Sequence, residues 1–163
     1  MPDLRIVVLA SGAGTLLQAL LDSDIGRRIV AVGSDQSEAP ALARAWAADV
    51  PTFVVPMAED REVWNIDLVQ HLQAHEADFV VTAGFMRVLG GTVIEAFENR
   101  IINSHPALLP SFPGAHAVRD AVESGVKVTG CTIHIVDEGV DTGPIIAQCP
   151  VTIDDGDTVE VLH

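Results

Sequence analysis

Basic residues are scarce in this chain of 163 residues. Nine lysines and arginines stand against 23 aspartates and glutamates, which gives a formal net charge of −14. Such a charge repels phosphate backbones and anionic lipid headgroups, so we expect neither a nucleic acid nor a membrane partner. A small anionic ligand therefore needs a local set of hydrogen-bond donors.

Cysteines, export signals and long apolar runs are also scarce or absent. The two cysteines are too few for a disulfide framework, which indicates a reducing compartment. The first residues show no basic segment followed by an apolar stretch and a cleavage site, so we expect no export signal. No apolar run approaches the roughly 20 residues that a membrane helix needs. We therefore predict a soluble, cytoplasmic protein.

The length and the hydrophobic content predict one compact domain. Hydrophobic residues make up 48% of the chain and charged residues 20%, and no stretch has the composition of a linker. We expect a single domain over residues 1–163 with one ordinary core. A capping pattern, Asp157 followed by Glu160, starts a final helix that stops at His163 after about one turn. We therefore also expect this domain to be truncated at its C-terminus.

Apolar runs of strand length alternate with segments of helical periodicity along most of the chain. We predict strands at residues 4–10, 29–33, 52–55, 79–83, 100–103, 127–136 and 144–151, and helices at residues 16–21, 40–48, 59–75, 90–97 and 115–123. The early strands are hydrophobic throughout, which is typical of a parallel sheet with helices on both faces. The last two strands are joined by a connector too short for a parallel crossover. The predicted fold class is α/β, a mostly parallel central sheet with an antiparallel C-terminal strand pair.

The first candidate site is a glycine loop between the first strand and the first helix. Gly12 and Gly14 direct unpaired backbone amides above the sheet edge, an arrangement that binds anions. A dinucleotide fingerprint requires a third glycine where Leu17 stands, although Asp35 lies near the distance of a ribose-binding acid. The pattern favours a phosphate monoester, while a dinucleotide and a merely structural turn stay open.

The second candidate site is the sequence Asn103-Ser104-His105-Pro106. Side chains alternate along a strand, so Asn103 and His105 should lie on one face and Ser104 on the other. The pair would stand beyond the carboxyl end of a parallel strand, where open α/β sheets bind ligands. An amide N–H and an imidazolium directed at one point stabilise an oxyanion as a carbonyl carbon becomes tetrahedral. The alternative is that both side chains only bond the loop.

Asp141 lies in an acidic, glycine-containing hairpin connector. It is either a solvated turn former or a partner of His105 that raises the pKa of the imidazole by charge pairing. Covalent catalysis has little support, because no serine stands in a nucleophile elbow. The histidines are scattered and no HExxH or CxxC motif occurs, so we expect no metal. We expect His134 to point off a strand face as packing or support.

Taken together, these segments resemble the folate-dependent formyltransferases, and among them the glycinamide ribonucleotide formyltransferases of purine synthesis. The matching segments are residues 7–14, 17–19, 83–89, 103–110, 112–114 and 137–144. They span the chain essentially end to end, and their order and spacing are highly specific together. The resemblance implies a Rossmann-like formyltransferase fold, with 10-formyltetrahydrofolate as the formyl donor and glycinamide ribonucleotide as the acceptor.

The resemblance also implies roles for particular residues. Asn103 and His105 hold the formyl oxygen, and Asp141 supports His105 and the proton transfers. The ribonucleotide phosphate is implied at Gly12, Ala13, Gly14, Thr15 and Leu16, although related enzymes commonly carry a polar residue where Leu16 stands. The folate pocket is implied at Arg61, Met86, Arg87, Val88, Leu89, Asn103, Val136, Asp137, Glu138, Gly139 and Val140. The resemblance further implies that the Leu109-Pro110 bond is cis. It implies neither a metal nor a covalent enzyme intermediate.

Several alternatives stay open. A formyltetrahydrofolate deformylase of the same fold passes the formyl group to water, but usually carries an extra N-terminal domain. Formylation of amino sugars or of methionyl-tRNA occurs in the same superfamily, and the net charge opposes the tRNA case. Leu17, in place of the third glycine, argues against a nicotinamide-dependent oxidoreductase. The presence of Asn103, His105 and Asp141 argues against a catalytically silent binding protein. The expected partners are the two small molecules, and a homodimer stays open.

Overall fold

The computed structural model describes residues 4–162. The chain divides into two compact units, Met1–Ile101 and Ile102–His163. The first three residues, which entered the export-signal prediction, and His163, where the predicted truncation falls, lie outside the described residues. The single-domain organisation stays a prediction.

The strands form a seven-stranded mixed sheet in the order β3-β2-β1-β4-β5-β6-β7. The strands of the first unit are β1 (Ile6–Leu9), β2 (Ile29–Ser34), β3 (Thr52–Val54) and β4 (Phe79–Thr82). They pair in parallel, and Val8 of β1 stands opposite Val32 on one side and Val81 on the other. The parallel part of the predicted sheet is confirmed.

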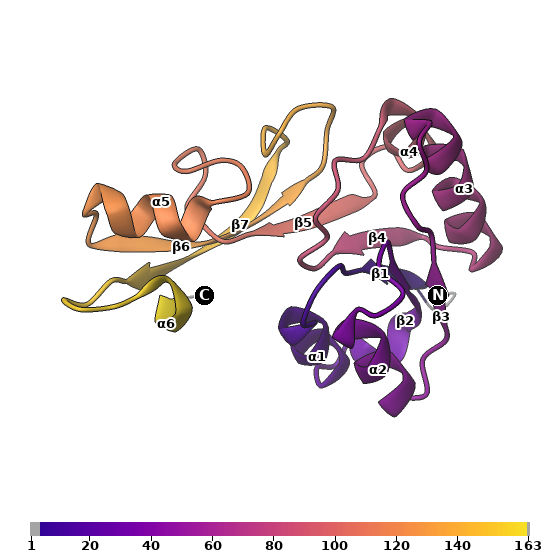
Figure 1. Ribbon diagram of the computed structural model, residues 1–163, viewed down its shortest axis with the longest axis horizontal. Helices are drawn as coiled ribbons and strands as arrows, with labels where there is room; N and C mark the ends of the chain where they lie inside the picture. The colour runs from indigo at the N-terminus through magenta and orange to yellow at the C-terminus, as the bar shows by residue number, and fades with distance from the viewer. Residues whose placement is uncertain (1–3, 163) are drawn as a thin grey trace. The chain divides into compact units, whose positions relative to one another are not determined.

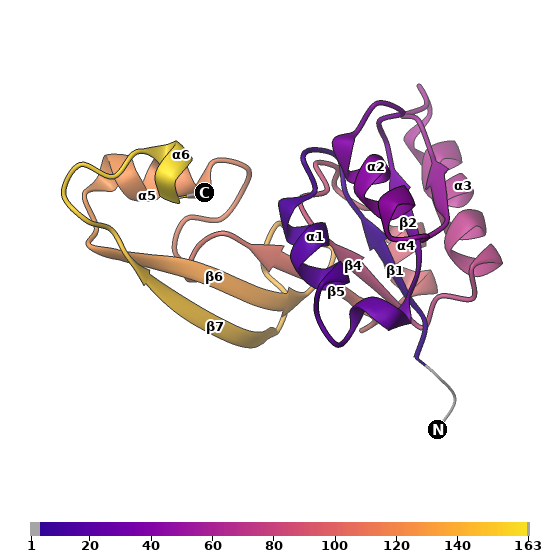
Figure 2. The ribbon, with the colours of Figure 1, turned by 90° about the horizontal axis from the view of Figure 1, so that it is seen from below.

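Helices cover both faces of the sheet in the first unit. They are α1 (Thr15–Leu21), the 3-10 helix η1 (Gly26–Arg28), α2 (Pro40–Ala47), α3 (Arg61–Ala74) and α4 (Gly91–Ala96). Figures 1 and 2 show α1 and α2 on one face and α3 and α4 on the other. The helix α2 opens on a proline, as predicted, because the first turn has no need of that N–H group. The Asp60 carboxylate caps α3 by accepting from the amides of Glu62 and Val63.

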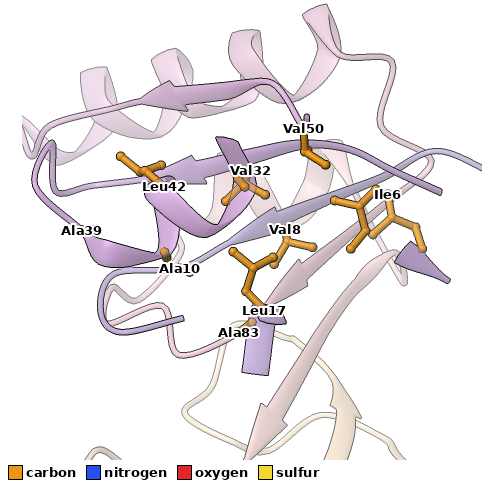
Figure 3. Packing of buried hydrophobic residues seen from close by; sticks show 12 residues of the cluster. Ile6, Val8, Ala10, Leu17, Val32, Ala39, Leu42, Val50 and Ala83 are labelled. Carbon is orange, nitrogen blue, oxygen red and sulfur yellow. The ribbon is translucent and has the colours of Figure 1, made fainter. Parts of the chain in front are cut away.

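The core of the first unit lies between the sheet and the α1–α2 layer (Figure 3). Val8 and Val32 project from adjacent strands, and Leu17 of α1 and Leu42 of α2 close over them. Leu17 is completely buried. The residue that breaks the dinucleotide pattern therefore fills the core between helix and strand.

We expect Leu17→Ala to lower the free energy of unfolding by about 2–5 kcal/mol, because it removes buried methyl groups and leaves a cavity. Leu20→Ala, at a partly buried position on the same helix, is the matched control and should cost less. Denaturant unfolding of both variants measures the difference. Equal losses would show that Leu17 does not fill a tightly packed site.

A histidine at the end of α3 gives the first unit a pH-dependent stability. His75 stacks on Phe53 with ring centroids 5.3 Å apart. Burial lowers the pKa of His75 below its ordinary 6.5, and the charges of His71 and Arg5 lower it further. The folded state therefore binds this proton less tightly than the unfolded state. We expect the free energy of unfolding to fall as the pH drops below 6.5 and to lack this loss above it.

Urea unfolding at about pH 7.5 and about pH 5.5 measures this loss. His75→Gln should lose less stability between the two pH values than the unsubstituted protein. His116→Gln, at an exposed position, should lose as much. If His75→Gln keeps the full loss, the pH dependence arises elsewhere.

The second unit is built on antiparallel strands. It contains β5 (Ile101–His105), which begins at the last residue of the first unit, together with α5 (Ala117–Ser124), β6 (Val128–Ile135), β7 (Ile145–Thr152) and α6 (Val159–Leu162). β6 pairs antiparallel with both β5 and β7, which confirms the predicted C-terminal pair. β7 is exposed along its whole length.

Two local predictions are wrong and one is confirmed. The strand predicted to stop at Asn103 continues to His105, because β6 supplies partners for the additional residues. We predicted Asp157 as the cap of the last helix, but the Thr158 hydroxyl accepts from the α6 amide of Val161, while Asp157 accepts from the Asp154 amide. The Leu109-Pro110 bond is cis, as the resemblance implies.

None of the helices within residues 4–162 has the length and apolar character that a bilayer crossing requires.

Candidate functional site

The end of β5 places two of the predicted catalytic residues on one face. In the antiparallel register, Asn103 stands opposite His134 of β6, and His105 stands opposite Thr132. Between them, Ser104 points away, with its Oγ atom 4.0 Å from the Cys131 Sγ atom. The alternation predicted from the sequence is confirmed.

His105 is almost fully buried, and both of its ring nitrogens face acceptors. Nε2 lies 2.8 Å from the carbonyl oxygen of Phe112, and Nδ1 lies 3.4 Å from the Asp141 Oδ2 atom. A carbonyl oxygen accepts hydrogen bonds and cannot donate them, so Nε2 carries the hydrogen. An imidazolium satisfies both acceptors with its two N–H groups, which a neutral ring cannot do.

Asp141 stands between two imidazole rings and is no solvated turn former. Its side chain is 12% exposed, and its Oδ1 atom lies 3.5 Å from the His134 Nε2 atom. Its Oδ2 atom accepts from the Gly114 amide at 2.7 Å and faces His105. The second unit thus brings Asp141 to His105, as the sequence predicts for a functional partner.

His134 contributes more to this cluster than the sequence analysis assigned to it. Its Nδ1 atom lies 2.9 Å from the Ile135 carbonyl oxygen, and its Nε2 atom lies 3.1 Å from the Asn103 Nδ2 atom. With its hydrogen on Nδ1, the ring can accept from the Asn103 amide through Nε2 and so direct that amide. The signal was the pairing of the β5 and β6 strands, which sets His134 opposite Asn103.

In the first unit, the glycine loop is held against α2. Gly14 has a φ of 72°, and a Cβ atom there would lie 2.7 Å from the Ala41 Cα atom, so this position requires glycine. Arg44 of α2 donates to the Ala13 carbonyl oxygen at 2.7 Å. Gly12, Ala13 and Thr15 are exposed, whereas Leu16 packs partly against the core. The loop therefore presents backbone and one hydroxyl to solvent.

The predicted folate residues of the first unit come together. Arg61 donates to the Val88 carbonyl oxygen and lies over the Trp64 ring at 4.8 Å from its centroid. Met86 and Val88 are 67% and 64% exposed, respectively. Leu89, in contrast, is buried, which shows that it contributes packing.

Arg87 and Asp35 form an ion pair with Nε and Oδ2 2.6 Å apart. The second oxygen of this carboxylate accepts from the Ser11 hydroxyl at 2.6 Å. Both oxygens of Asp35 are therefore engaged by protein groups. This engagement argues against the ribose-binding role that the dinucleotide alternative requires.

The predicted folate residues of the second unit lie in the connector between β6 and β7. Asp137 closes this connector by accepting from the Gly139 amide and the Thr142 hydroxyl. Val136 and Asp137 are half-buried, and Glu138, Gly139 and Val140 are exposed. The connector also carries Asp141, so its closure helps to fix the position of the carboxylate beside His105.

The cluster in the second unit combines the Asn103 amide, which contacts His134, with a carboxylate that lies 3.4 Å from His105 and 3.5 Å from His134. Such a set can stabilise negative charge on a carbonyl oxygen and accept a proton from an attacking amine. Across residues 4–162, no three side chains of His, Cys, Asp or Glu are grouped so that they could hold a metal ion.

Comparisons with known proteins agree with this chemistry. The formyl transferase family model matches residues 4–163. A phosphoribosylglycinamide formyltransferase from Mycobacterium tuberculosis is 52% identical over 98% of this chain and 76% of its own length. The human trifunctional purine biosynthetic protein adenosine-3 is 42% identical over 97% of this chain, which corresponds to 16% of that protein. The crystal structure of glycinamide ribonucleotide transformylase 1 from Symbiobacterium toebii superposes with a TM-score of 0.95 at 47% identity, over 99% of this chain and 80% of that one.

Proposed function

The chain belongs to the formyl transferase family, and from this premise we propose that it transfers a formyl group from 10-formyltetrahydrofolate to the amine of glycinamide ribonucleotide. The reaction is a step of purine biosynthesis, which we assign to the cytoplasm. The observation that carries the proposal is the contact of His105 with Asp141 beside Asn103, on the face of β5.

Asn103 and His105 hold the formyl oxygen in this proposal. The Asn103 amide is directed by His134, and its N–H groups are donors of the kind that oxyanion sites use. The Nε2–H group of His105 is occupied by the Phe112 carbonyl oxygen, so Nδ1–H is the group that turns to the formyl oxygen. Its distance of 3.4 Å from Asp141 is long for a hydrogen bond, and such contacts often rearrange when substrate binds.

Asp141 accepts the proton that the amine loses as it attacks the formyl carbon. The carboxylate is held by the Gly114 amide and stands between two imidazoles, so it remains in place as the charge on the substrate changes. Proton transfer to a positioned side chain typically accelerates a reaction about 10²- to 10⁴-fold. The tetrahedral species then collapses, the bond between the formyl carbon and N10 of the folate breaks, and N10 takes the proton that Asp141 accepted. Tetrahydrofolate leaves without a covalent enzyme intermediate or a metal.

We assign each substrate to its own set of residues. The backbone of Gly12 to Gly14 and the exposed Thr15 hydroxyl receive the ribonucleotide phosphate, because the half-buried Leu16 offers no polar group. The folate contacts the residues that present exposed surface or backbone around the Arg61–Val88 hydrogen bond and in the β6–β7 connector. These residues are Arg61, Met86, Arg87, Val88, Val136, Asp137, Glu138, Gly139 and Val140. The folate also contacts Asn103 of β5 and the backbone of the buried Leu89.

The amine dependence of folate release tests the proposal. The protein is mixed with 10-formyltetrahydrofolate, and the appearance of tetrahydrofolate is followed with and without glycinamide ribonucleotide. We expect release only when the amine is present. Release at the same rate without the amine favours the deformylase alternative, and no release in either case removes the proposed function.

A further inference from the structure

We propose that Asp35 is a positioning residue that locks the glycine loop to the folate segment, Gly84 to Leu89, so that one buried carboxylate sets the binding of both substrates. The inference rests on the proposed function for what the two loops bind. The contacts themselves lie within the first unit and are independent of that function.

One carboxylate joins two loops that follow different strands. Asp35 comes directly after β2, and its Oδ1 atom accepts from the Ser11 hydroxyl, which follows β1. Its Oδ2 atom accepts from Arg87 Nε at 2.6 Å, in the segment that follows β4, and from the Gln36 side chain at 3.1 Å. Asp35 therefore bridges the first residue before the glycine loop and the arginine of the folate segment.

The backbone joins the same two loops through Ser11. The Ser11 hydroxyl accepts from the Met86 amide at 2.9 Å, while the Ser11 amide donates to the Gly84 carbonyl oxygen at 3.1 Å. Because the hydroxyl hydrogen goes to Asp35, its oxygen is turned to accept from Met86. Asp35 thus fixes the rotamer on which the Met86 hydrogen bond depends.

The charge of Asp35 makes this junction strong. Its side chain is 1% exposed, whereas the Arg87 side chain is 35% exposed. Burial raises the pKa of Asp35, but the hydrogen bonds from Ser11, Arg87 and Gln36 outweigh it and hold the pKa below the ordinary 3.8. The carboxylate is therefore ionised at neutral pH, and hydrogen bonds to an ionised group are about twice as strong as neutral ones.

The position of Arg87 follows from this geometry. The contact with Asp35 uses the Nε–H group of Arg87, and the Arg87 side chain is 35% exposed, so part of the guanidinium stays accessible to a ligand. Without the carboxylate, the Arg87 side chain regains rotamer freedom. Substrate binding must then offset the entropy that is lost when this side chain becomes ordered again. We expect that cost to weaken substrate binding far more than the chemical step.

Asp35→Asn tests the inference, because it keeps the shape but removes the charge and places an amide donor or a weaker acceptor against Arg87. We expect the KM values for 10-formyltetrahydrofolate and glycinamide ribonucleotide to rise about tenfold or more, the usual effect of losing a hydrogen bond to a charged group. We expect kcat to change less than about threefold, because the groups at the reacting atoms stay in place. Asp24→Asn, with the same charge change on an exposed turn, should keep all three constants.

Hydrogen exchange of the Met86 amide provides a readout that does not depend on activity. Asp35→Asn should accelerate this exchange, and Ser11→Ala, which removes the acceptor itself, should do so at least as strongly. Unchanged KM values, or unchanged Met86 exchange in Asp35→Asn, would overturn the inference. A lowered unfolding midpoint of Asp35→Asn with both KM values unchanged would also overturn the inference, because Asp35 would then have only a structural role. If the unsubstituted protein transfers no formyl group, the proposed function fails, and Met86 exchange still decides the role of Asp35.

Discussion

His105→Ala is expected to lower kcat for formyl transfer by about 10²- to 10⁴-fold, the largest effect among the substitutions considered. The substitution removes the imidazole that faces Asp141 and the Phe112 carbonyl oxygen, and with it the proposed donor to the formyl oxygen. The rate under saturating concentrations of both substrates measures the effect. KM should change much less, because the oxyanion develops only as the amine attacks.

A second histidine of the same unit provides the control. His116 precedes α5, is exposed, and makes no side-chain capping hydrogen bond. His116→Ala should therefore retain the full rate. His105→Ala must also remain folded, which its circular dichroism and unfolding midpoint report. A folded His105→Ala variant with an unimpaired rate would remove His105 from the catalytic set.

Asp141→Asn is expected to lower kcat by about 10²-fold or more, since the amide cannot accept the amine proton. The amide keeps an oxygen for the Gly114 N–H group, so the connector should hold its conformation. Its NH₂ group, however, places a donor beside the two imidazoles where an ionised acceptor stood. The loss should therefore appear in kcat with a smaller change in KM.

Asp155→Asn is the matched control for this substitution. Asp155 carries the same charge, is 94% exposed and pairs with Lys127 at the surface. Surface pairs of this kind contribute little, so the variant should keep both its rate and its stability. An Asp141→Asn variant that turns over as fast as Asp155→Asn would contradict the proposed proton acceptor.

The parallel half of the sheet was predictable because its strands are continuous apolar runs separated by helical periodicity. The run from Ile6 to Leu9 is fully buried, as a strand covered on both faces must be. The end of β5 was less predictable, because the polar Ser104 and His105 join the strand only through their pairing with β6. A tertiary contact determined that boundary, and local propensity did not.

The residue types and spacing predicted that Asn103 and His105 share a face of the strand and that Asp141 reaches His105, whereas the groups that hold these side chains could not be predicted. Phe112 acts through its backbone carbonyl and Gly114 through its backbone amide, so neither side chain signals the role. His134 enters the cluster through the strand register, which the sequence does not fix to the residue. The spacing of Asp35 from the glycine loop resembled that of a ribose-binding acid. Its ion-pair partner Arg87 stands 52 positions away in the chain, so the sequence did not reveal that pair.

The helix cap shows the same limit on a smaller scale. Asp157 and Thr158 are adjacent and both are good capping residues. The structure uses Thr158 for α6, while Asp157 turns back to the Asp154 amide. The sequence predicted the helix correctly, but the choice between neighbouring caps depends on the direction of the preceding turn.

The most direct measurement is a crystal structure of this protein with glycinamide ribonucleotide and a 10-formyl folate analogue that cannot transfer its formyl group. We expect the formyl oxygen at about 2.7–3.1 Å from the Asn103 Nδ2 atom and the His105 Nδ1 atom. The Asp141 carboxylate should then lie within reach of the attacking amine. A formyl oxygen that contacts neither Asn103 nor His105 would contradict the proposed catalytic set.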